Sequence, residues 1–534
     1  MPVLTGGQAL VQQLKKEGVE VIFALPGVQL DWLFDALYDE QDAIRVIHTR
    51  HEQATSYMAD GYARTSGKVG VCVVVPGPGL LNATAGLSTA YACSSPVLCI
   101  SGQIDSAMIG KGKGMLHEIK DQLGAVASVT KWAARAERPE DVAKVVRLAF
   151  HELTTGRPRP VEIEVSPDIL GATANVRLLE PATTAAAEAD PEAIAAAARA
   201  LGAAQKPVIF AGGGVILGAA WQELQQLAEL LQAPVVMTSE GRGALSDEHY
   251  LAQMPSAGKY LLPDADVVLA VGTRFLQPAT QPWGVKPHQT VIQLDIDPEE
   301  VGRNYEPTVR LVADAKAGLT ALMRAAAPLN RPRESREDEL RAVQEQVRSD
   351  AYRDEHRAPM AMAVREALPE DGILVGEMTQ VAYWSRSAFP VYGPRTFITP
   401  GYQGTLGYGF ATALGAQVAA PDRKVVCITG DGGFMYNVQE LSTAVRHHIN
   451  LVTVLFNDNA YGNVKRIQEL SYNGRTIASD LLNPDFMKLA EAFGVAGMRA
   501  TDPKQLQGTL KDALQLNQPV LIEVPVGAMP PLRV

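Results

Sequence analysis

The stretch CITGDGGFMYN, residues 427–437, decides the fold class, because it is typical of a strand that turns into a helix through glycines. The apolar run 424–429 predicts a buried strand, and the pattern of 436–447 predicts a helix. Between them a single acid, Asp431, stands among three glycines. Glycines let the backbone approach a ligand closely, and a helix N-terminus offers free N–H groups to an anion. The stretch therefore predicts a phosphate site at the end of a parallel strand.

An acid in a phosphate site repels the phosphate unless a cation lies between them. Mg²⁺ fits this position, because it takes oxygen ligands and is commonly shared between carboxylates and phosphates. The next apolar run, LVTVLFN at 451–457, leads into Asp458, which lies 27 residues after Asp431. One helix and one strand fill that interval, so adjacent parallel strands bring both carboxylates to the same edge of the sheet. The spacing favours a magnesium–phosphate site over a simple turn.

Three segments of the 534-residue chain alternate strand-like and helix-like patterns. We expect domains at 1–175, 190–330 and 355–534, separated by a Pro- and Ala-rich linker and by a charged linker helix. The strands are continuous apolar runs, as in parallel sheets that are buried on both faces. The clearest runs are VIFAL, VGVCVVV and VLCISG, then KPVIFAGG, PVVMTS, VVLAVG and VIQLDID, and finally ILVGE, KVVCITG, LVTVLFN and PVLIEVP. The predicted fold class is therefore α/β, with three domains whose parallel sheets are flanked by helices.

Composition and charge exclude several classes of protein. The net charge is −11 and no basic stripe is visible, so we expect no nucleic-acid partner. No apolar run approaches the roughly 18 residues of a membrane span, and MPVLTGGQ at the start of the sequence does not resemble the apolar region of a signal peptide. The four cysteines lie in apolar segments without a CxxC motif: Cys72, Cys93, Cys99 and Cys427. Buried thiols of this kind indicate a cytoplasmic protein.

The segment 430–463, GDGGFMYNVQELSTAVRHHINLVTVLFNDNAYGN, resembles the superfamily of acetolactate synthase, 2-oxoacid decarboxylase and benzaldehyde lyase. GDG followed at this distance by Asn-Asn is the thiamine diphosphate signature of these enzymes, although the second Asn is Asp458 here. The resemblance covers nearly the whole chain and implies pyrimidine-binding, middle and diphosphate-binding domains, in that order. It implies that thiamine diphosphate and Mg²⁺ bind together. The implied metal ligands are the side chains of Asp431 and Asp458 and the main-chain carbonyl of Ala460; the cofactor neighbours are Gly432, Gly433, Tyr461 and Gly462.

A second match lies in the first domain, where TRHEQATSYMADGYARTSG at 49–67 resembles the RHE…A…GYAR text of the family. By this resemblance Glu52 hydrogen-bonds the pyrimidine ring of the cofactor, whose amine then removes the C2 proton and leaves a C2 carbanion. From the residues alone, Glu52 is equally a surface acid of a helix. Ala54 and Met58, at helical spacing, mark a buried face and do not decide between these roles.

Two further cofactor contacts follow from the resemblance. The family places a bulky apolar residue beneath the thiazolium ring, in the context G-x-[large]-G, and GYQGTLGYGF supplies Gly404 and Leu406 in that context. A core leucine at a helix start is the alternative for Leu406. Upstream, VGEMTQVAYW matches the region that contacts the diphosphate and thiazole, where Gln380 falls on a cofactor position.

Gln29 in LPGVQLDWLF and His117 in GKGMLHEIKDQ fall where relatives place polar groups that face the substrate. Benzaldehyde lyase-like enzymes have a histidine and a glutamine there, and the two types are exchanged in this chain. A histidine at this place is suited to proton transfer during addition and release. The alternative for His117 is a solvated loop histidine.

Several marks of the housekeeping acetolactate synthases are missing. Their arginine, tryptophan and lysine are replaced by Pro278, Ile467 and Pro167, and their Phe-Gln pair is Leu116-His117. FAGGGVILG at 210–218 has glycines after a strand but no acid about 20 residues later, so FAD is not expected. These losses favour a flavin-free carboligase, lyase or decarboxylase that acts on 2-oxoacids, aldehydes or hydroxyketones. A true acetolactate synthase acting on pyruvate and a catalytically silent cofactor-binding scaffold or regulator remain alternatives.

The resemblance also implies a homo-oligomer, a homotetramer built as a dimer of dimers. In the family the cofactor lies between the first domain of one subunit and the third domain of another. Glu52 of one chain is therefore expected to face Asp431 of its partner, so that active sites are shared.

Overall fold

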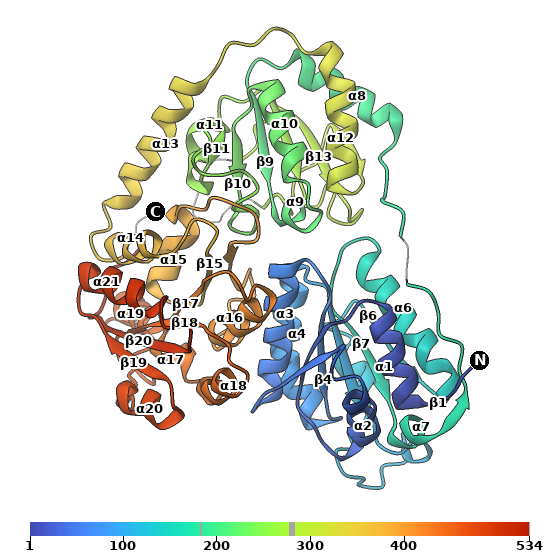
Figure 1. Cartoon of the computed structure of the whole chain (residues 1–534). Coiled ribbons are helices and arrows are strands. Elements are labelled where there is room, and N and C mark those ends of the chain that lie inside the picture. The colour runs from blue at the N-terminus through green and yellow to red at the C-terminus, as the bar shows by residue number, and fades with distance from the viewer. Residues whose placement is uncertain (182–183, 277–283, 533–534) are drawn as a thin grey trace.

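The computed structural model describes residues 1–181, 184–276 and 284–532 (Figure 1). Within these ranges the chain forms three six-stranded parallel sheets flanked by helices, which confirms the predicted fold class. A short antiparallel pair, β1 (Val3–Thr5) with β8 (Thr173–Asn175), joins the two ends of the first unit. In the described part of the chain, no helix combines the length and the apolar character needed to cross a membrane.

The first sheet has the strand order β3-β2-β4-β5-β7-β6. Its strands are β2 (Val21–Ala24), β3 (Arg45–His48), β4 (Gly70–Val74), β5 (Val97–Gly102), β6 (Trp132–Ala136) and β7 (Val161–Val165). Its helices are α1 (Gly6–Lys16), α2 (Asp31–Asp39), α3 (Glu52–Ser66), α4 (Pro78–Cys93), α5 (Gln122–Val126), α6 (Val142–Thr154) and α7 (Pro167–Gly171). The strands β4 and β5 are buried along their whole length, which explains their unbroken apolar sequences.

The middle sheet has the order β11-β10-β9-β12-β13-β14. Its strands are β9 (Pro207–Ala211), β10 (Val235–Met237), β11 (Ala252–Gln253), β12 (Val267–Val271), β13 (Thr290–Asp295) and β14 (Val309–Val312). Its helices are α8 (Pro191–Ala203), α9 (Gly213–Leu217), α10 (Trp221–Leu231), α11 (Gly258–Leu261) and α12 (Ala315–Ala326). The charged linker helix α13 (Glu337–Tyr352) then runs to the third sheet and buries Leu340 and Val347 in the middle core.

The third sheet has the order β16-β15-β17-β18-β20-β19. Its strands are β15 (Ile373–Gly376), β16 (Phe397–Ile398), β17 (Val425–Gly430), β18 (Val452–Asn457), β19 (Ala496–Arg499) and β20 (Val520–Pro525). Its helices are α14 (Ala358–Ala367), α15 (Gln380–Ala388), α16 (Tyr408–Ala419), α17 (Asp431–Phe434), α18 (Leu441–Arg446), α19 (Gly462–Ser471), α20 (Phe486–Phe493) and α21 (Pro503–Ala513). Numbered within each sheet, the first and third sheets share the order 2-1-3-4-6-5.

The helix predicted over 436–447 begins at Val438 and ends at Arg446 in the structure. It opens as a 3-10 turn over Val438–Glu440 that continues directly into α18, and the four-residue helix α17 precedes it. The break between α17 and this turn comes at Asn437, whose backbone leaves the helical region and whose side-chain amide donates to the carbonyl of Gly407 at 2.6 Å. This long-range hydrogen bond holds the Asn437 side chain away from the helix and ties the segment to the start of α16.

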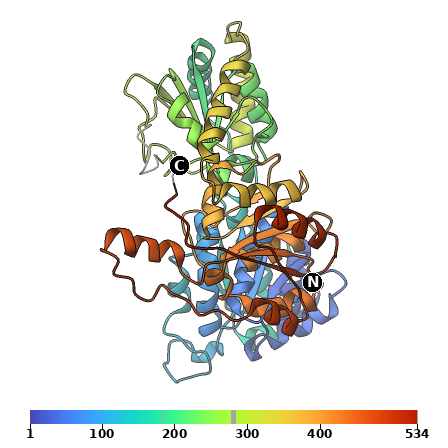
Figure 2. The ribbon, with the colours of Figure 1, turned by 90° about the vertical axis from the view of Figure 1, so that its left-hand side faces the viewer.

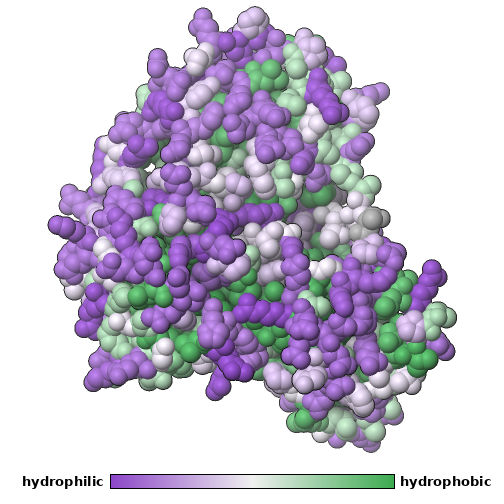
Figure 3. Space-filling view, viewed as in Figure 1, coloured by the Kyte–Doolittle hydropathy of each residue, from purple (hydrophilic) through white to green (hydrophobic). Residues whose placement is uncertain are grey.

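The first and third domains meet where α3 packs on α16 (Figure 1). A Cβ atom added to Gly61 of α3 would lie 2.0 Å from the carbonyl oxygen of Thr412 on α16. A Cβ atom added to Gly415 of α16 would lie 2.0 Å from the carbonyl oxygen of Met58 on α3. The two helix backbones therefore touch, and one apolar core extends through both domains. Figure 3 shows that apolar patches also interrupt the hydrophilic surface over this lower half of the molecule.

Candidate active site

The strand ends that carry the two predicted aspartates lie side by side. The strands β17 and β18 pair in parallel, with Gly430 opposite Phe456, so Asp431 and Asp458 follow at the same edge of the sheet. This is the arrangement expected from their spacing. Both aspartates line a cavity of about 250 Å³. The other residues predicted at the cofactor or metal from the third domain also line it: Gln380, Gly404, Leu406, Gly432, Gly433, Ala460, Tyr461 and Gly462.

The aspartate pair concentrates negative charge in a partly dry place. Asp431 is buried, and Asn483 donates its side-chain amide to the Oδ2 atom of Asp431 at 2.6 Å. Burial and, next in size, the nearby carboxylate of Asp431 together raise the pKa of Asp458 to about 6. A divalent cation between the two carboxylates would relieve this repulsion. In the described ranges no group of three or more His, Cys, Asp or Glu side chains is placed to hold a metal, so a cation here would also need main-chain or ligand oxygens.

The glycines beside Asp431 leave no room for side chains. A Cβ atom on Gly432 would lie 2.7 Å from the ring of Tyr461, and one on Gly433 would lie 2.3 Å from the Oε1 atom of Glu377. The backbone of this turn therefore packs so closely against its neighbours that only glycine fits there. The donor set fits a diphosphate with Mg²⁺: two carboxylates, a main-chain carbonyl at Ala460, and glycine backbone that lines the cavity.

Glu377 is a site residue that the sequence reasoning missed. It is fully buried just after β15, and it accepts hydrogen bonds from the Thr429 hydroxyl and from the Gly407 N–H, the latter at 2.5 Å. Burial raises the pKa of Glu377 to about 7. Glu377 thus ties the strand that leads into Asp431 to the turn that follows Leu406. An acid at the end of the apolar run ILVGE was the available signal.

Two arginines orient Gln380. Arg357, itself fully buried, donates to the Oε1 atom of Gln380 at 2.7 Å, and Arg466 donates to the same oxygen at 3.1 Å. The side-chain oxygen of Gln380 therefore already accepts two hydrogen bonds, one of them from Arg466 of α19. Neither arginine was identified from sequence, because the contacts join segments that are 23 and 86 residues apart.

Leu406 lies at the cavity wall and not in the core. It is partly exposed and immediately precedes Gly407, which caps α16 in a left-handed conformation with φ of +81°. Gly404 also has a positive φ, of +59°, and a Cβ atom there would lie 3.2 Å from the methyl group of Met378. The alternative of a core leucine at a helix start does not describe this position.

The predicted residues of the first domain lie outside this cavity. Glu52 opens α3, which His51 caps by accepting the Gln53 N–H at 3.1 Å, and the Oε2 atom of Glu52 accepts the amide of Asn82 at 3.0 Å. His117 has a positive φ of +67° and is partly exposed. Its Nδ1 atom lies 3.2 Å from the Oε1 atom of Gln29, so the structure brings the exchanged pair together. None of these three predicted residues is among the described residues that line the aspartate cavity.

A second cavity, of about 620 Å³, lies where the three domains meet. It borders Gly213 and Gly214 of the glycine run that was not expected to bind a flavin. Burial raises the pKa of Asp295, on the wall of this cavity, to about 6. Arg157 of the first domain and Thr399 of the third also line it. Of the positions that distinguish the chain from acetolactate synthases, Pro278 lies outside the described residues.

Known proteins resemble the whole of this arrangement. Residues 4–125 match the N-terminal TPP binding domain of thiamine pyrophosphate enzymes, residues 194–322 the central domain, and residues 377–524 the C-terminal TPP binding domain. The chain is 35% identical to a probable acetolactate synthase large subunit of Methanocaldococcus jannaschii, over 99% of this chain and 93% of the relative. It is 36% identical to a probable 2-ketoarginine decarboxylase of Pseudomonas aeruginosa, over 98% and 94%. It is 33% identical to the acetolactate synthase isozyme 3 large subunit of Escherichia coli, over 98% and 95%.

Proposed function

Because the chain belongs to the family of thiamine pyrophosphate enzymes, we propose that it forms or cleaves carbon–carbon bonds next to a carbonyl group with thiamine diphosphate and Mg²⁺. Its substrates are 2-oxoacids, aldehydes or hydroxyketones. The observation that supports this proposal most strongly is that Asp431, Asp458 and Leu406 line the same cavity. The two carboxylates supply metal ligands there, and the leucine supplies an apolar support.

The residues of the third domain would hold the cofactor. Asp431 and Asp458 would bind Mg²⁺ through side-chain oxygens, and Ala460 through its main-chain carbonyl. Gly432 and Gly433 line the same cavity, and their backbone would face the diphosphate. Tyr461 and Gly462 line the same wall, and Gln380 is held by two arginines beside it.

The residues of the first domain would handle protons. Thiamine diphosphate, when bound, supplies a nucleophilic C2 carbon that adds to a carbonyl. Glu52 would hold a proton on the pyrimidine ring, and the Asn82 amide, at 3.0 Å, orients its carboxylate. His117 would move a proton at its imidazole, with Gln29 fixing the ring through the 3.2 Å contact.

A complete site is proposed to need two copies of the chain. The end of the first domain that carries Gln29 exposes large apolar side chains, among them Val28, Trp32 and Leu116. The third domain exposes more of them on α19 and the segment that follows, which projects from the body in Figure 2: Val464, Ile467, Leu470, Tyr472, Ile477 and Leu482. Exposed apolar surface beside a half-site is typical of an interface. A homodimer, paired again into a tetramer, would cover both surfaces and place Glu52 beside the partner's Asp431.

True acetolactate synthesis from pyruvate is the second candidate, and the relatives with that printed name favour it. The replaced positions Ile467 and Pro167 argue for another substrate. A flavin is not expected in the purified protein, and its absorption spectrum tests this directly.

The proposed function is tested in two steps. Purified protein is first stripped with EDTA, and activity is expected to return only when thiamine diphosphate and Mg²⁺ are added together. Pyruvate, phenylglyoxylate, benzaldehyde and short hydroxyketones are then screened with identification of the products. Activity that survives complete chelation contradicts the metal site. Cofactor binding without turnover of any donor would favour a silent scaffold.

A further inference from the structure

Residues 399–407, here called the Leu406 segment, connect β16 to α16 and carry Leu406 near their end. Three glycines interrupt the segment, and all three have positive φ: +57° at Gly401, +59° at Gly404 and +81° at Gly407. Glycine-rich backbone has many accessible conformations, so its folded position depends on what anchors it. The position of Leu406 in the cavity therefore depends on contacts made elsewhere along the segment.

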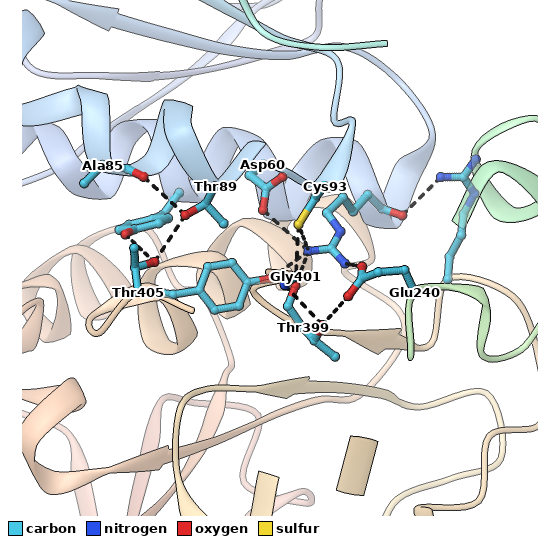
Figure 4. A network of polar contacts seen from close by, with 12 residues as sticks. Asp60, Ala85, Thr89, Cys93, Glu240, Thr399, Gly401 and Thr405 are labelled. Atoms are coloured by element: carbon cyan, nitrogen blue, oxygen red, sulfur yellow. Dashed lines mark hydrogen bonds and ion pairs between the residues drawn. The ribbon is translucent and has the colours of Figure 1, made fainter. Parts of the chain in front are cut away.

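The distal anchor is a polar network that joins all three domains (Figure 4). Arg64 of α3 donates to the carbonyl oxygen of Thr399 at 2.6 Å and forms an ion pair with the Oε2 atom of Glu240, also at 2.6 Å. The other carboxylate oxygen of Glu240 accepts the hydroxyl of Thr399. Glu240 of the middle domain thus holds Thr399, the first residue of the Leu406 segment, in two ways. It accepts the Thr399 hydroxyl directly, and it pairs with Arg64 of the first domain, which donates to the Thr399 carbonyl.

The network lies at the edge of the 620 Å³ cavity, with its arginine largely withdrawn from water and its Glu240 side chain 27% exposed. The side chain of Arg64 is 10% exposed, and Asp60, one turn earlier on α3, is fully buried at 3.8 Å from it. Burial raises the pKa of Asp60. Glu240, at 2.6 Å, is the nearer of the two acids to Arg64. In such surroundings an ion pair holds its geometry more firmly than at a solvated surface.

The contacts continue along the segment toward Leu406. The Thr399 hydroxyl also accepts the N–H of Gly401 at 3.3 Å. The Tyr57 hydroxyl donates to the hydroxyl of Thr405 at 3.0 Å, and Thr89 of α4 lies 3.2 Å from the same oxygen. Beyond Leu406, Glu377 and Asn437 hold Gly407. Thr405 and Gly407, the residues on either side of Leu406, are each tied to a neighbouring element.

From this geometry we infer that Glu240, Arg64 and Thr399 are positioning residues, and that the middle domain sets the place of Leu406 although none of its described residues lines the aspartate cavity. The inference rests on the proposed function, because Leu406 matters only if the cofactor binds beside it. It assigns to the middle domain an effect on catalysis that needs no ligand in the 620 Å³ cavity.

The test replaces the Thr399 hydroxyl while keeping its shape. Thr399→Val removes the donor to Glu240, and Thr399→Ser restores it. With thiamine diphosphate and Mg²⁺ saturating, Thr399→Val is expected to slow hydrogen–deuterium exchange at the cofactor C2, followed by NMR, about tenfold. Thr399→Ser should stay within about twofold of the wild type. Glu240→Gln is a second route if Thr399→Val does not fold, and Glu306→Gln, which breaks an Arg–Glu pair confined to the middle domain, is the matched control.

A double-mutant cycle with Leu406→Ala separates positioning from general damage. If the network acts through Leu406, adding Thr399→Val to Leu406→Ala should slow the exchange no further. An equal tenfold loss in both backgrounds overturns the inference, and so does normal exchange in Thr399→Val itself. If the wild type shows no cofactor-dependent exchange, the proposed function fails and this inference fails with it; loss of the network effect alone leaves the proposed function standing.

Discussion

The first and third domains share a sheet order but carry different residues at their strand ends. Both have the strand order 2-1-3-4-6-5, and in the third sheet Asp431 and Asp458 follow the third and fourth strands. Gln29 follows the first strand of one sheet and Gln380 the first strand of the other. Glu52 opens the helix after the second strand, where the other domain has Leu406 just before the equivalent helix. In the proposed site, the strand ends of the first domain would supply the proton-handling groups and those of the third domain the metal ligands.

The two equivalent helices also meet each other, and they do so symmetrically. Gly61 of α3 approaches Thr412 of α16, while Gly415 of α16 approaches Met58 of α3, each at a distance that excludes a methyl group. The two domains therefore contribute alike to the contact between α3 and α16, and they differ in the side chains at their strand ends. Four changes can break or sharpen this comparison.

The largest effect is expected where the first domain supplies its acid. Glu52→Gln keeps the shape of the side chain and the contact with Asn82 but cannot hold the ring proton. Exchange at the cofactor C2 should slow by roughly three orders of magnitude, while the affinity for thiamine diphosphate stays nearly unchanged. NMR of the bound cofactor and a binding titration measure the two quantities. Exchange at the wild-type rate would remove Glu52 from this role.

The next effect concerns the buried acid of the third domain. The folded state raises the pKa of Glu377 from 4.5 to about 7 through burial, so it binds the proton more tightly than the unfolded chain does. Stability contributed by the protonated form is present below pH 4.5 and is lost as the pH rises to about 7. The loss approaches roughly 3 kcal/mol. Glu377→Gln cannot titrate, so its stability relative to the wild type should rise over that window.

Thermal midpoints from pH 4.5 to pH 8.5 measure this difference for Glu377→Gln and the wild type. The midpoint of the variant should gain on the wild type as the pH increases. Glu370→Gln, an exposed acid of the same domain, serves as the control and should show no such gain. Parallel curves for Glu377→Gln and the wild type would mean that Glu377 is not held neutral by burial.

A smaller effect is expected at the symmetrical helix contact. Gly61→Ala and Gly415→Ala each push a methyl group against a backbone carbonyl, and each should destabilise the protein by about 2 kcal/mol. Gly508→Ala in α21 meets no atom within 4 Å and should stabilise it slightly. Unfolding midpoints of the three variants give the comparison. Equal losses at Gly61 and Gly415 support the symmetry, and a loss at only one of them contradicts it.

The sequence predicted what local spacing controls. The distance from Asp431 to Asp458 defines one strand–helix–strand unit, and the parallel pairing of β17 with β18 follows from it. The buried strands were likewise visible as unbroken apolar runs. The missed features depend on contacts between distant segments: the helix break at Asn437 made by Gly407, and the network of Arg64, Glu240 and Thr399. The periodicity of a single sequence does not show which distant segment will supply the hydrogen-bond partner of a given side chain.

The central claim is that Glu52 and Asp431 act in one site built from two chains. Glu52→Ala and Asp431→Ala are purified separately, and each alone should be nearly inactive. When they are unfolded and refolded together, about half of the dimers should be mixed, each with one intact site, so about a quarter of wild-type activity should return. Mass measurement establishes that mixed dimers have formed. Recovery near a quarter supports the shared site, and no recovery in mixtures that contain mixed dimers contradicts it.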